Sequence, residues 1–273
     1  MKPVRFWKYC AAGNDFLLLD VRDRQIADPS GLARAMCRRH FGVGADGMLE
    51  VAPDPVESEL IRVDYFNADG SPASFCGNGA RCAAHFAWWR KMSSHEMTLD
   101  FGTYRVQASL EGEGMRLVRT TLPPAEWESD RVRVTLEEGR ESFEGEIVRA
   151  GVGHAVFPVH AIDSVDLEAV ARAFRRTGES EARAALNVTL VEVEGNGALR
   201  VRTHERGCGE TLACGSAAAA AGAWAARRKD GNDWNILPPG GIPLEVRMEE
   251  DGTLRLSGDA RLIFDGQWFP EDP

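Results

Sequence analysis

The sequence has no long apolar run. The longest, residues 213–226, is rich in alanine and glycine, and at about 14 residues it is too short to span a bilayer. The first 16 residues carry three basic side chains, but Gly13-Asn14-Asp15 interrupts the apolar stretch that a signal peptide requires. We therefore expect neither a targeting segment nor a membrane span, and we expect a cytoplasmic protein.

Positive charge is also scarce. Lysine and arginine total 32 against 42 aspartates and glutamates, which gives a net charge of −10 and a pI near 5.2. A nucleic-acid partner requires a basic surface, so none is expected. The six cysteines are expected to be reduced thiols, because cytoplasmic proteins rarely keep disulfides. A length of 273 residues with 44% hydrophobic residues suits two globular domains of ordinary size.

What the sequence does contain is an internal repeat. The stretch Cys76-Gly77-Asn78-Gly79-Ala80-Arg81-Cys82 is echoed 138 residues later by Cys214-Gly215-Ser216, and each opens an Ala-rich segment with a tryptophan. The same offset relates Arg62-Val63 to Arg200-Val201. The chain therefore reads as one unit written twice. Two copies are too few for a solenoid, so we expect two similar domains that face each other.

The predicted fold class is α+β, in two pseudo-symmetric domains. Each copy offers short strand-like segments and two helices, the second of which starts at the cysteine. A sheet wrapped around that central helix would explain why its residues are small and apolar. The N-terminal domain is predicted over residues 1–119, with the tail 262–273 returning to it as a strand, and the C-terminal domain over 120–261. Helices are predicted at residues 30–40, 80–91, 166–176 and 214–228.

Cys76 and Cys214 have the setting that acid–base chemistry requires. Each is predicted at a helix N-terminus, where free backbone N–H groups and the helix dipole stabilise an anion and lower the pKa of a thiol. With the two copies face to face, one thiolate would remove an α-hydrogen and the opposite thiol would protonate the other side of the carbon. The N–H groups that could hold the substrate carboxylate belong to Gly77, Asn78, Gly215 and Ser216. This arrangement predicts cofactor-free inversion of an amino acid.

Five motifs in order along the chain point to a known family. They are Gly13-Asn14-Asp15-Phe16, Gly44-Ala45-Asp46-Gly47, Phe66-Asn67-Ala68-Asp69-Gly70, the Cys76–Cys82 stretch, and Glu205-Arg206-Gly207-Cys208-Gly209-Glu210-Thr211 through Ala213-Cys214-Gly215. Together they resemble the diaminopimelate epimerase family. The resemblance implies a cytoplasmic homodimer that uses neither pyridoxal phosphate nor another cofactor. It would interconvert LL- and meso-2,6-diaminopimelate for lysine and peptidoglycan synthesis. It also implies paired domains of strands around a central helix.

The resemblance assigns roles to individual residues. Cys76 and Cys214 become the acid–base pair, conventionally proton donor and acceptor in that order. The residues that would tune the two thiols are His154 and Glu205. The reacting carboxylate would be held by Gly77, Asn78, Gly215 and Ser216. Other polar ends of the substrate would be bound by Asn14, Asn67, Asn187, Glu205 and Arg206. Arg206 would grip the distal carboxylate with two hydrogen bonds, and Phe264 stands where the family carries an aromatic residue at its subunit contact.

Two positions depart from the family pattern. Val152, which the repeat aligns with Asn14, stands where the family often has asparagine, and Gly47 stands where some members have a larger polar residue. Both departures concern the substrate more than the reaction, so a racemase of another amino acid stays open. A ligand-binding protein without chemistry on the same fold stays open as well. Exchange of the α-hydrogen of LL-diaminopimelate in D₂O would distinguish these functions.

The remaining cysteines lack a repeated setting. They are interpreted as packing residues: Cys10, Cys37, Cys82 and Cys208. Cys76/Cys82 and Cys208/Cys214 share a spacing, but five intervening residues exceed the two to four that are usual for zinc, and no histidine pair completes a set. No metal is therefore expected. For Arg206, a surface ion pair with Glu205 or Glu210 is the alternative to substrate binding.

Overall fold

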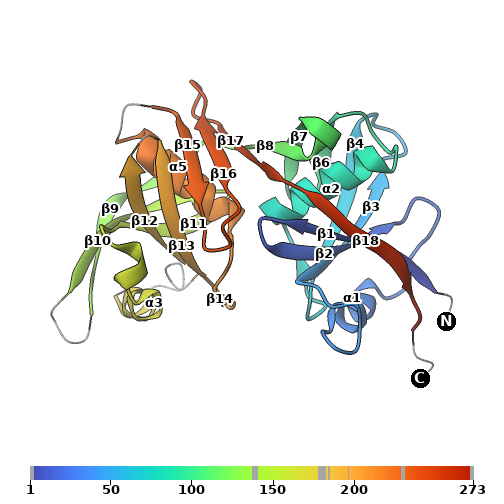
Figure 1. The fold of residues 1–273 in the computed structure, drawn as a ribbon, viewed down its shortest axis with the longest axis horizontal. Coiled ribbons are helices and arrows are strands. Elements are labelled where there is room, and N and C mark those ends of the chain that lie inside the picture. The colour runs from blue at the N-terminus through green and yellow to red at the C-terminus, as the bar shows by residue number, and fades with distance from the viewer. Residues whose placement is uncertain are drawn as a thin grey trace. The chain divides into compact units, whose positions relative to one another are not determined.

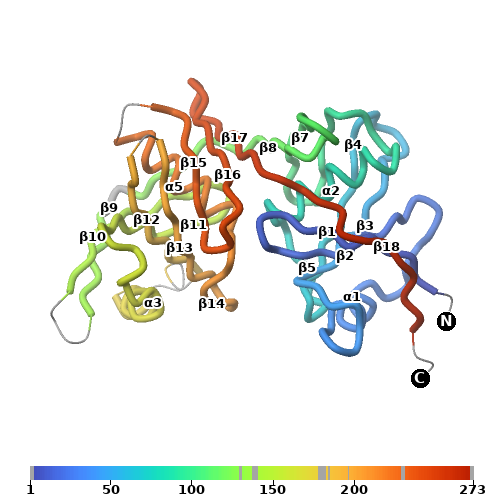
Figure 2. Tube along the Cα trace, viewed as in Figure 1, coloured from blue at the N-terminus to red at the C-terminus, as the bar shows by residue number. Residues whose placement is uncertain are grey.

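The computed structural model describes residues 3–136, 141–177, 183, 185–195, 197–228 and 231–270 (Figures 1 and 2). Contacts along the chain divide it into two compact units. Unit 1 comprises Met1–Thr120 and Gly258–Pro273, and unit 2 comprises Thr121–Ser257. Within the described ranges, no helix combines the length and the apolar character that crossing a membrane requires.

Unit 1 is built on a sheet that includes a strand from the far end of the chain. Its strands are β1 (Val4–Ala11), β2 (Asn14–Asp20), β3 (Gly47–Pro53), β4 (Leu60–Asn67), β5 (Pro72–Ala73), β6 (Glu96–Asp100), β7 (Arg105–Glu111), β8 (Leu117–Leu122) and β18 (Arg261–Trp268). Pairing orders them β18-β1-β2-β3-β4-β6-β7-β8, with β5 beside β4. The pairs β2–β3 and β4–β6 are parallel and the others antiparallel. Figure 2 shows β18 in red along β1 in blue.

Unit 2 repeats this order from one continuous segment. Its strands are β9 (Glu126–Thr135), β10 (Ser142–Ala150), β11 (Val152–Pro158), β12 (Asn187–Gly195), β13 (Ala198–Glu205), β14 (Gly209–Glu210), β15 (Asp233–Leu237), β16 (Leu244–Met248) and β17 (Leu254–Asp259). The order is β9-β10-β11-β12-β13-β15-β16-β17, and the parallel pairs β11–β12 and β13–β15 fall where unit 1 has its own. β18 therefore takes in unit 1 the place that β9 takes in unit 2. The predicted pseudo-symmetric α+β fold is confirmed.

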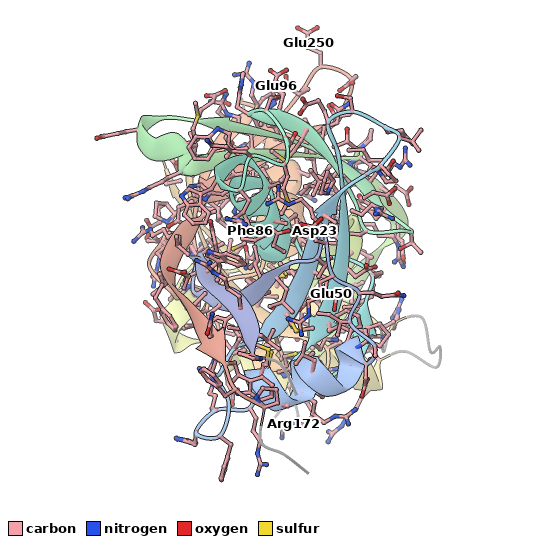
Figure 3. All side chains as sticks on the ribbon, turned by 90° about the vertical axis from the view of Figure 1, so that its right-hand side faces the viewer. Asp23, Glu50, Phe86, Glu96, Arg172 and Glu250 are labelled. Atoms are coloured by element: carbon pink, nitrogen blue, oxygen red, sulfur yellow. The ribbon has the colours of Figure 1, made fainter. Side chains whose placement is uncertain are left out.

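A helix that follows a cysteine runs against most strands of each unit. α2 (Gly77–Trp89) contacts β1, β2, β3, β6 and β7, and α5 (Gly215–Ala226) contacts β10 to β13, β15 and β16 (Figure 1). A helix enclosed in this way has room only for small side chains. In α5 a Cβ added to Gly222 would lie 2.5 Å from Cγ1 of Val246, so even alanine is too large there. The larger Phe86 of α2 (Figure 3) is completely buried in the core of unit 1.

A shorter helix covers the other face of each sheet. Along β2, Phe16 and Leu18 join the core around α2, whereas Leu17 and Leu19 pack with α1 (Pro29–Cys37). Successive side chains of a strand point to opposite faces, so β2 is covered on both sides, and its apolar run is continuous for that reason. In unit 2, α3 (Leu167–Arg176) packs Phe174 against Phe157 of β11 in the equivalent way.

Helix boundaries differ from the predicted ones by a few residues. The carboxylate of Asp28 caps α1 by accepting the N–H of Gly31 at 2.8 Å, so this helix begins before residue 30. It ends at Cys37, because Arg38 is extended and His40 has a φ of +75°. α2 begins at Gly77, three positions before the prediction. Single 3₁₀ turns are η1 (Glu113–Met115) and η2 (Ile162–Ser164).

Candidate functional site

Cys76 is the N-cap of α2. Its backbone is extended, with φ −146° and ψ 121°, and its Sγ accepts a hydrogen bond from the backbone N–H of Gly79 at 3.4 Å. The sulfur therefore takes up one of the N–H groups that have no partner inside the helix, at the positive end of the helix dipole. Negative charge on this sulfur is favoured, which suits a thiol that must give and take protons.

Asn78 belongs to a polar chain in unit 1. Its Oδ1 accepts from Nη2 of Arg81 at 2.6 Å, and its Nδ2 donates to Oδ1 of Asn14 at 2.6 Å. Nδ2 of Asn14 donates in turn to Oδ2 of Asp46 at 3.0 Å. Because a guanidinium only donates and a carboxylate only accepts, the chain fixes the orientation of both amides. The structure thus joins two predicted site residues, Asn14 and Asn78, directly, and it anchors them at the two ends by Arg81 and Asp46, to which the sequence analysis gave no role.

Gly47 and Asn67 face each other across β3 and β4. A Cβ on Gly47 would lie 2.6 Å from Cε2 of Tyr65 and 2.9 Å from the carbonyl oxygen of Phe66, so a larger residue requires Tyr65 to move. Asn67 closes the turn after β4: its Nδ2 donates to Oγ of Ser71 at 3.0 Å. The departure at Gly47 therefore has a packing reason in this chain.

Cys214 is the N-cap of α5, with φ −127° and ψ 115°. Its Sγ lies 3.3 Å from Oγ of Ser216, and this hydroxyl lies 2.9 Å from Nε2 of His154. Nδ1 of His154 lies 2.9 Å from Oγ1 of Thr189. The predicted tuning residue His154 thus reaches the thiol through Ser216. Thr189 completes the chain and was not anticipated, because only the strand pairing of β11 with β12 brings it beside His154.

His154 is neutral over the whole physiological range. The ring is fully buried, and burial lowers its pKa from 6.5 to about 3. A neutral imidazole has one N–H donor and one acceptor nitrogen, and here each nitrogen meets a hydroxyl that can play either part. The ring can therefore pass a proton along the chain from Ser216 without carrying a charge itself.

The depressed pKa makes stability depend on pH. Between about 3 and 6.5 the unfolded chain binds a proton on residue 154 that the folded chain excludes. We therefore expect the free energy of unfolding to fall below pH 6.5, by about 1.4 kcal/mol per pH unit from this group. Urea unfolding at about pH 6.5, 5.5 and 4.5 measures the slope, which should be shallower by that amount in His154→Gln. The exposed residue His160 supplies the control, since His160→Gln should retain the full slope; parallel profiles for the wild type and His154→Gln would contradict the assignment.

Asn187 and Glu205 shape the segment that follows β13. Oδ1 of Asn187 accepts the backbone N–H of Arg206 at 2.9 Å, and Oε1 of Glu205 accepts the hydroxyl of Thr211 at 2.6 Å. Asn187 thus holds the backbone at the start of a turn, and Glu205 holds the side chain of Thr211 after it. Both were predicted to meet the substrate, and the structure adds that both support the segment leading to Cys214.

The side chain of Arg206 projects from this segment and is exposed. Across the described part of the chain, no carboxylate lies within ion-pair distance of its guanidinium, so the alternative of a surface ion pair with Glu205 or Glu210 is wrong. Glu210 instead accepts two hydrogen bonds from Arg202, at 2.7 and 2.8 Å. A guanidinium held by its backbone but without an anion is available to a ligand carboxylate.

Comparison with known proteins assigns the chain to a family. The sequence profile described as diaminopimelate epimerase matches residues 6–126 and 147–263, a span that includes both cysteines and both central helices. The chain belongs to the diaminopimelate epimerase family. The resemblance inferred from the motifs is therefore confirmed.

Relatives named diaminopimelate epimerase match over nearly their whole length. Those from Xylella fastidiosa (strain M23) and Hydrogenobaculum sp. (strain Y04AAS1) are each 34% identical, covering 98% and 95% of this chain and 97% and 96% of the relative. The relative from Aquifex aeolicus (strain VF5) is 31% identical, covering 98% of this chain and 99% of its own.

Solved structures share the fold at lower identity. A hydroxyproline epimerase from Agrobacterium vitis superposes with a TM-score of 0.74 at 14% identity, over 99% of this chain and 94% of that one. A phenazine biosynthesis protein of the PhzF family from Bacillus anthracis gives a TM-score of 0.72 at 15% identity, over 98% and 99% of the two chains. At these identities the likeness concerns the fold alone.

Val152 distinguishes this chain from the usual family pattern. It is the first residue of β11, two positions before His154, and its side chain is 39% exposed. Next to it, a Cβ on Gly153 would lie 2.4 Å from Cδ2 of Leu186 and 2.8 Å from Nη1 of Arg149, so a side chain at this position would require both neighbours to move. An exposed apolar group therefore stands where an amide would offer hydrogen bonds.

The other four cysteines differ in burial. Cys37 and Cys82 are buried, and burial raises the pKa of Cys37 to about 12 and that of Cys82 well above its usual range; their interpretation as packing residues is confirmed. Cys10 is half-buried. Cys208 is exposed, so the packing interpretation was wrong for it. It lies between Gly207 and Gly209, whose φ values of +81° and +77° form a turn that projects from the unit.

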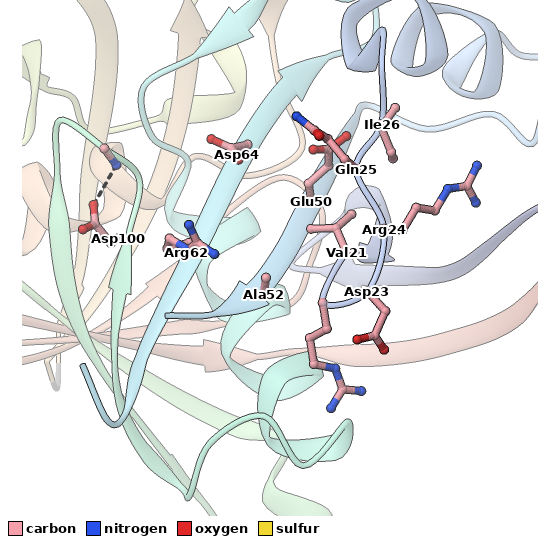
Figure 4. A pocket seen from close by; sticks show the side chains of 12 residues that line it. Val21, Asp23, Arg24, Gln25, Ile26, Glu50, Ala52, Arg62, Asp64 and Asp100 are labelled. Carbon is pink, nitrogen blue, oxygen red and sulfur yellow. Dashed lines mark hydrogen bonds between the residues drawn. The ribbon is translucent and has the colours of Figure 1, made fainter. Parts of the chain in front are cut away.

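Unit 1 also forms a pocket of about 730 Å³ that contains none of the predicted site residues (Figure 4). On its floor Glu50 of β3 lies directly across from Asp64 of β4. Burial, reinforced by the negative charge of Asp64, raises the pKa of Glu50 to about 7. Arg24, from the segment after β2, lines the same pocket and opposes that shift. The pocket is lined by side chains of both charges, and neither Cys76 nor Cys214 is among its lining residues.

Proposed function

We propose that this protein is a cofactor-independent epimerase that interconverts LL- and meso-2,6-diaminopimelate, with Cys76 and Cys214 as its two acid–base groups. The observation that carries the proposal is that each cysteine is the N-cap of the central helix in one of two units with the same strand order. Full-length relatives named for this activity, at 31–34% identity, support the choice of substrate.

In the proposed reaction a thiolate takes the α-hydrogen as a proton, and the other thiol delivers its own proton to the opposite face of the carbon. Each step moves one proton, so the two sulfurs exchange protonation states in a turnover and solvent resets them. Backbone N–H groups at the starts of α2 and α5 stabilise the charge that builds up on the carboxylate as the carbon ionises. These groups belong to Gly77, Asn78, Gly215 and Ser216.

His154 and Arg206 have supporting roles in this proposal. His154 stays neutral and holds the hydroxyl of Ser216 beside Cys214, and its proton can shift from one ring nitrogen to the other when Cys214 changes its protonation state, as the two 2.9 Å contacts of the ring permit. Glu205 supports the segment before Cys214 through Thr211. Arg206 holds the distal carboxylate of the substrate, and Asn14, Asn67 and Asn187 bind its remaining polar ends.

The test is exchange of the α-hydrogen. LL-diaminopimelate is incubated with the protein in D₂O, deuterium at the α-carbon is followed by NMR, and the stereoisomers are separated after chiral derivatisation. Exchange together with formation of the meso isomer supports the proposal. Exchange in another amino acid, but not in diaminopimelate, would indicate a racemase of different specificity, which the apolar Val152 would favour. No exchange in any amino acid would leave a binding protein.

We further propose that the protein works in the cytoplasm as a homodimer. Phe264 of β18 is 47% exposed and packs edge-on against Phe6 at a ring distance of 5.9 Å. Other exposed apolar groups lie on either side of it, Ile263 just before it on the same strand and Phe269 just after the strand ends. A strand that presents such groups to solvent suits a contact with a second copy of the chain.

Phe264→Glu should convert this dimer to single chains. A carboxylate placed in an apolar contact would have to lose its hydration on association. Sedimentation velocity at micromolar concentration should show the mass of one chain for this variant and of two for the wild type. Phe41, which is 74% exposed in unit 1, provides the matched control, and Phe41→Glu should remain dimeric. A Phe264→Glu protein that still sediments as a dimer would exclude this residue from the contact.

A further inference from the structure

Unit 1 buries a guanidinium one helical turn below Cys76. Arg81 of α2 is completely buried. Its Nη2 donates to Oδ1 of Asn78 at 2.6 Å, and its other nitrogens make long contacts of 3.4 Å with the carbonyl oxygens of Gly77 and Asp259. In the part of the chain that the structure describes, no carboxylate lies within ion-pair distance of it. A buried charge with only neutral partners is costly to fold.

The surroundings of Arg81 offer few charges to balance it. Burial lowers the pKa of the guanidinium, yet arginine keeps its proton in proteins. The titratable groups that face it are Cys82 and Cys76 of α2 and Asp259 of β17. The carboxylate of Asp259 is 2.5 Å from Arg261, and burial keeps Cys82 protonated. Cys10 of β1 adds a further thiol next to Cys82.

The second copy of the repeat lacks this charge. The offset of 138 residues places Ala219 at the position of Arg81, and Ala219 is buried in α5. Beside Cys214 stand instead the hydroxyl of Ser216 and the imidazole of His154, which is neutral. The helix dipole acts on both cysteines, but only Cys76 has a full positive charge on the next turn of its own helix.

We propose that Arg81 is a positioning residue that balances a thiolate on Cys76, so that Cys76 ionises at lower pH than Cys214. The inference rests on the proposed acid–base chemistry of the two cysteines, and it reverses the order that the family resemblance implies, in which Cys76 is the proton donor. The hydrogen bond to Asn78 alone does not explain why a guanidinium is buried here, because a neutral amide or a lysine could make the same bond. A thiolate on Cys76 would explain it. At rest the protein then holds its proton-abstracting group in unit 1 and its proton-donating group in unit 2.

The pH dependence of alkylation tests this without any substrate. Iodoacetamide reacts with the thiolate of each cysteine, and peptide mass spectrometry reports the rate for Cys76 and Cys214 separately. Cys76 is followed in Cys214→Ser and Cys214 in Cys76→Ser, so that the two titrations are independent. We expect the midpoint for Cys76 to lie below that for Cys214, and to rise by about one pH unit or more in Arg81→Met. Arg81→Lys, which keeps the charge, should restore most of the difference.

The control variant lies on the same helix as Arg81. Arg90, at the C-cap of α2, is ion-paired with Asp20 at 2.9 Å, and Arg90→Met should leave both midpoints where they are. An unchanged midpoint for Cys76 in Arg81→Met would overturn the proposal. If Arg81→Met does not fold, the test is the order of the two alkylation midpoints in the protein that keeps Arg81. Equal midpoints, or a lower midpoint for Cys214 than for Cys76, would overturn the proposal as well. Because no amino acid is present, a failure here is distinct from a failure of the epimerase assignment.

Discussion

Cys76→Ser and Cys214→Ser should each lower the rate of inversion of LL-diaminopimelate by about 10²–10⁴-fold. A serine hydroxyl is far less acidic than a thiol, so it neither gives up nor delivers a proton at neutral pH at a useful rate. The fold should persist, because serine fills almost the same space and can cap a helix as the cysteine does. Initial rates of meso-isomer formation measure the loss, and circular dichroism checks the fold.

A third cysteine separates proton transfer from a general need for thiols. Cys37 is buried under α1, and its thiol, with a pKa of about 12, has no part in proton transfer at neutral pH. Cys37→Ala should therefore turn over like the wild type. In D₂O, each serine variant should still exchange the α-hydrogen on the face of the α-carbon where its remaining cysteine acts. That exchange should incorporate deuterium with retention of configuration. Full turnover by either serine variant would rule out the two-thiol mechanism.

Arg206→Met should reduce kcat/KM for diaminopimelate by about two to three decades, which corresponds to about 3–4 kcal/mol. The reason is that the distal carboxylate of the bound substrate would be left without the cation that the proposed binding mode gives it. The guanidinium has no competing ion pair in the described residues, so its replacement removes a ligand contact without breaking a structural one. Steady-state kinetics in the LL-to-meso direction measure the effect.

Two further variants sharpen the test of Arg206. Arg247 is exposed, and its ion pairs with described residues are long, at 3.6 and 3.7 Å, so Arg247→Met should leave kcat/KM within a factor of about two. Val152→Asn should help diaminopimelate binding or leave it unchanged. If Arg206→Met scarcely alters kcat/KM for diaminopimelate, the distal carboxylate is held elsewhere and the substrate assignment loses its main support.

The repeat was sufficient to predict the symmetry of the fold. A constant offset between Cys76 and Cys214 required two similar units, and the small residues after each cysteine required helices enclosed by strands. The placement of Cys76 at a helix N-terminus was predicted correctly, but the helical range predicted for this segment, residues 80–91, began three residues late; the hydrogen bond from the Gly79 N–H to the sulfur was not predicted, because cysteine is not among the usual N-cap residues. The prediction for Cys208 failed because the turn between Gly207 and Gly209 depends on positive φ values that a glycine permits but does not require.

Contacts between residues that are far apart along the chain could not be predicted from the sequence. His154 and Ser216 are 62 residues apart, and their 2.9 Å contact follows from the position of α5 against β11. The same holds for Asn14 and Asn78, which are 64 residues apart. Arg81 was visible in the motif, but a sequence does not tell whether an arginine on a helix is solvated or buried without a carboxylate. Such information appears only once the strands that enclose the helix are in register.

The position of β18 sets the order in which the units can be completed. Unit 2 is contiguous, from Thr121 to Ser257, whereas unit 1 needs Gly258–Pro273 to finish its sheet. During synthesis residues 1–120 therefore leave the ribosome with β1 unpaired along one edge, and that edge has no partner until β18 is made. Domains generally fold from the N-terminus onwards as they emerge. Here the later unit closes first, and an open strand edge, which invites pairing with other chains, persists until β18 has been synthesised.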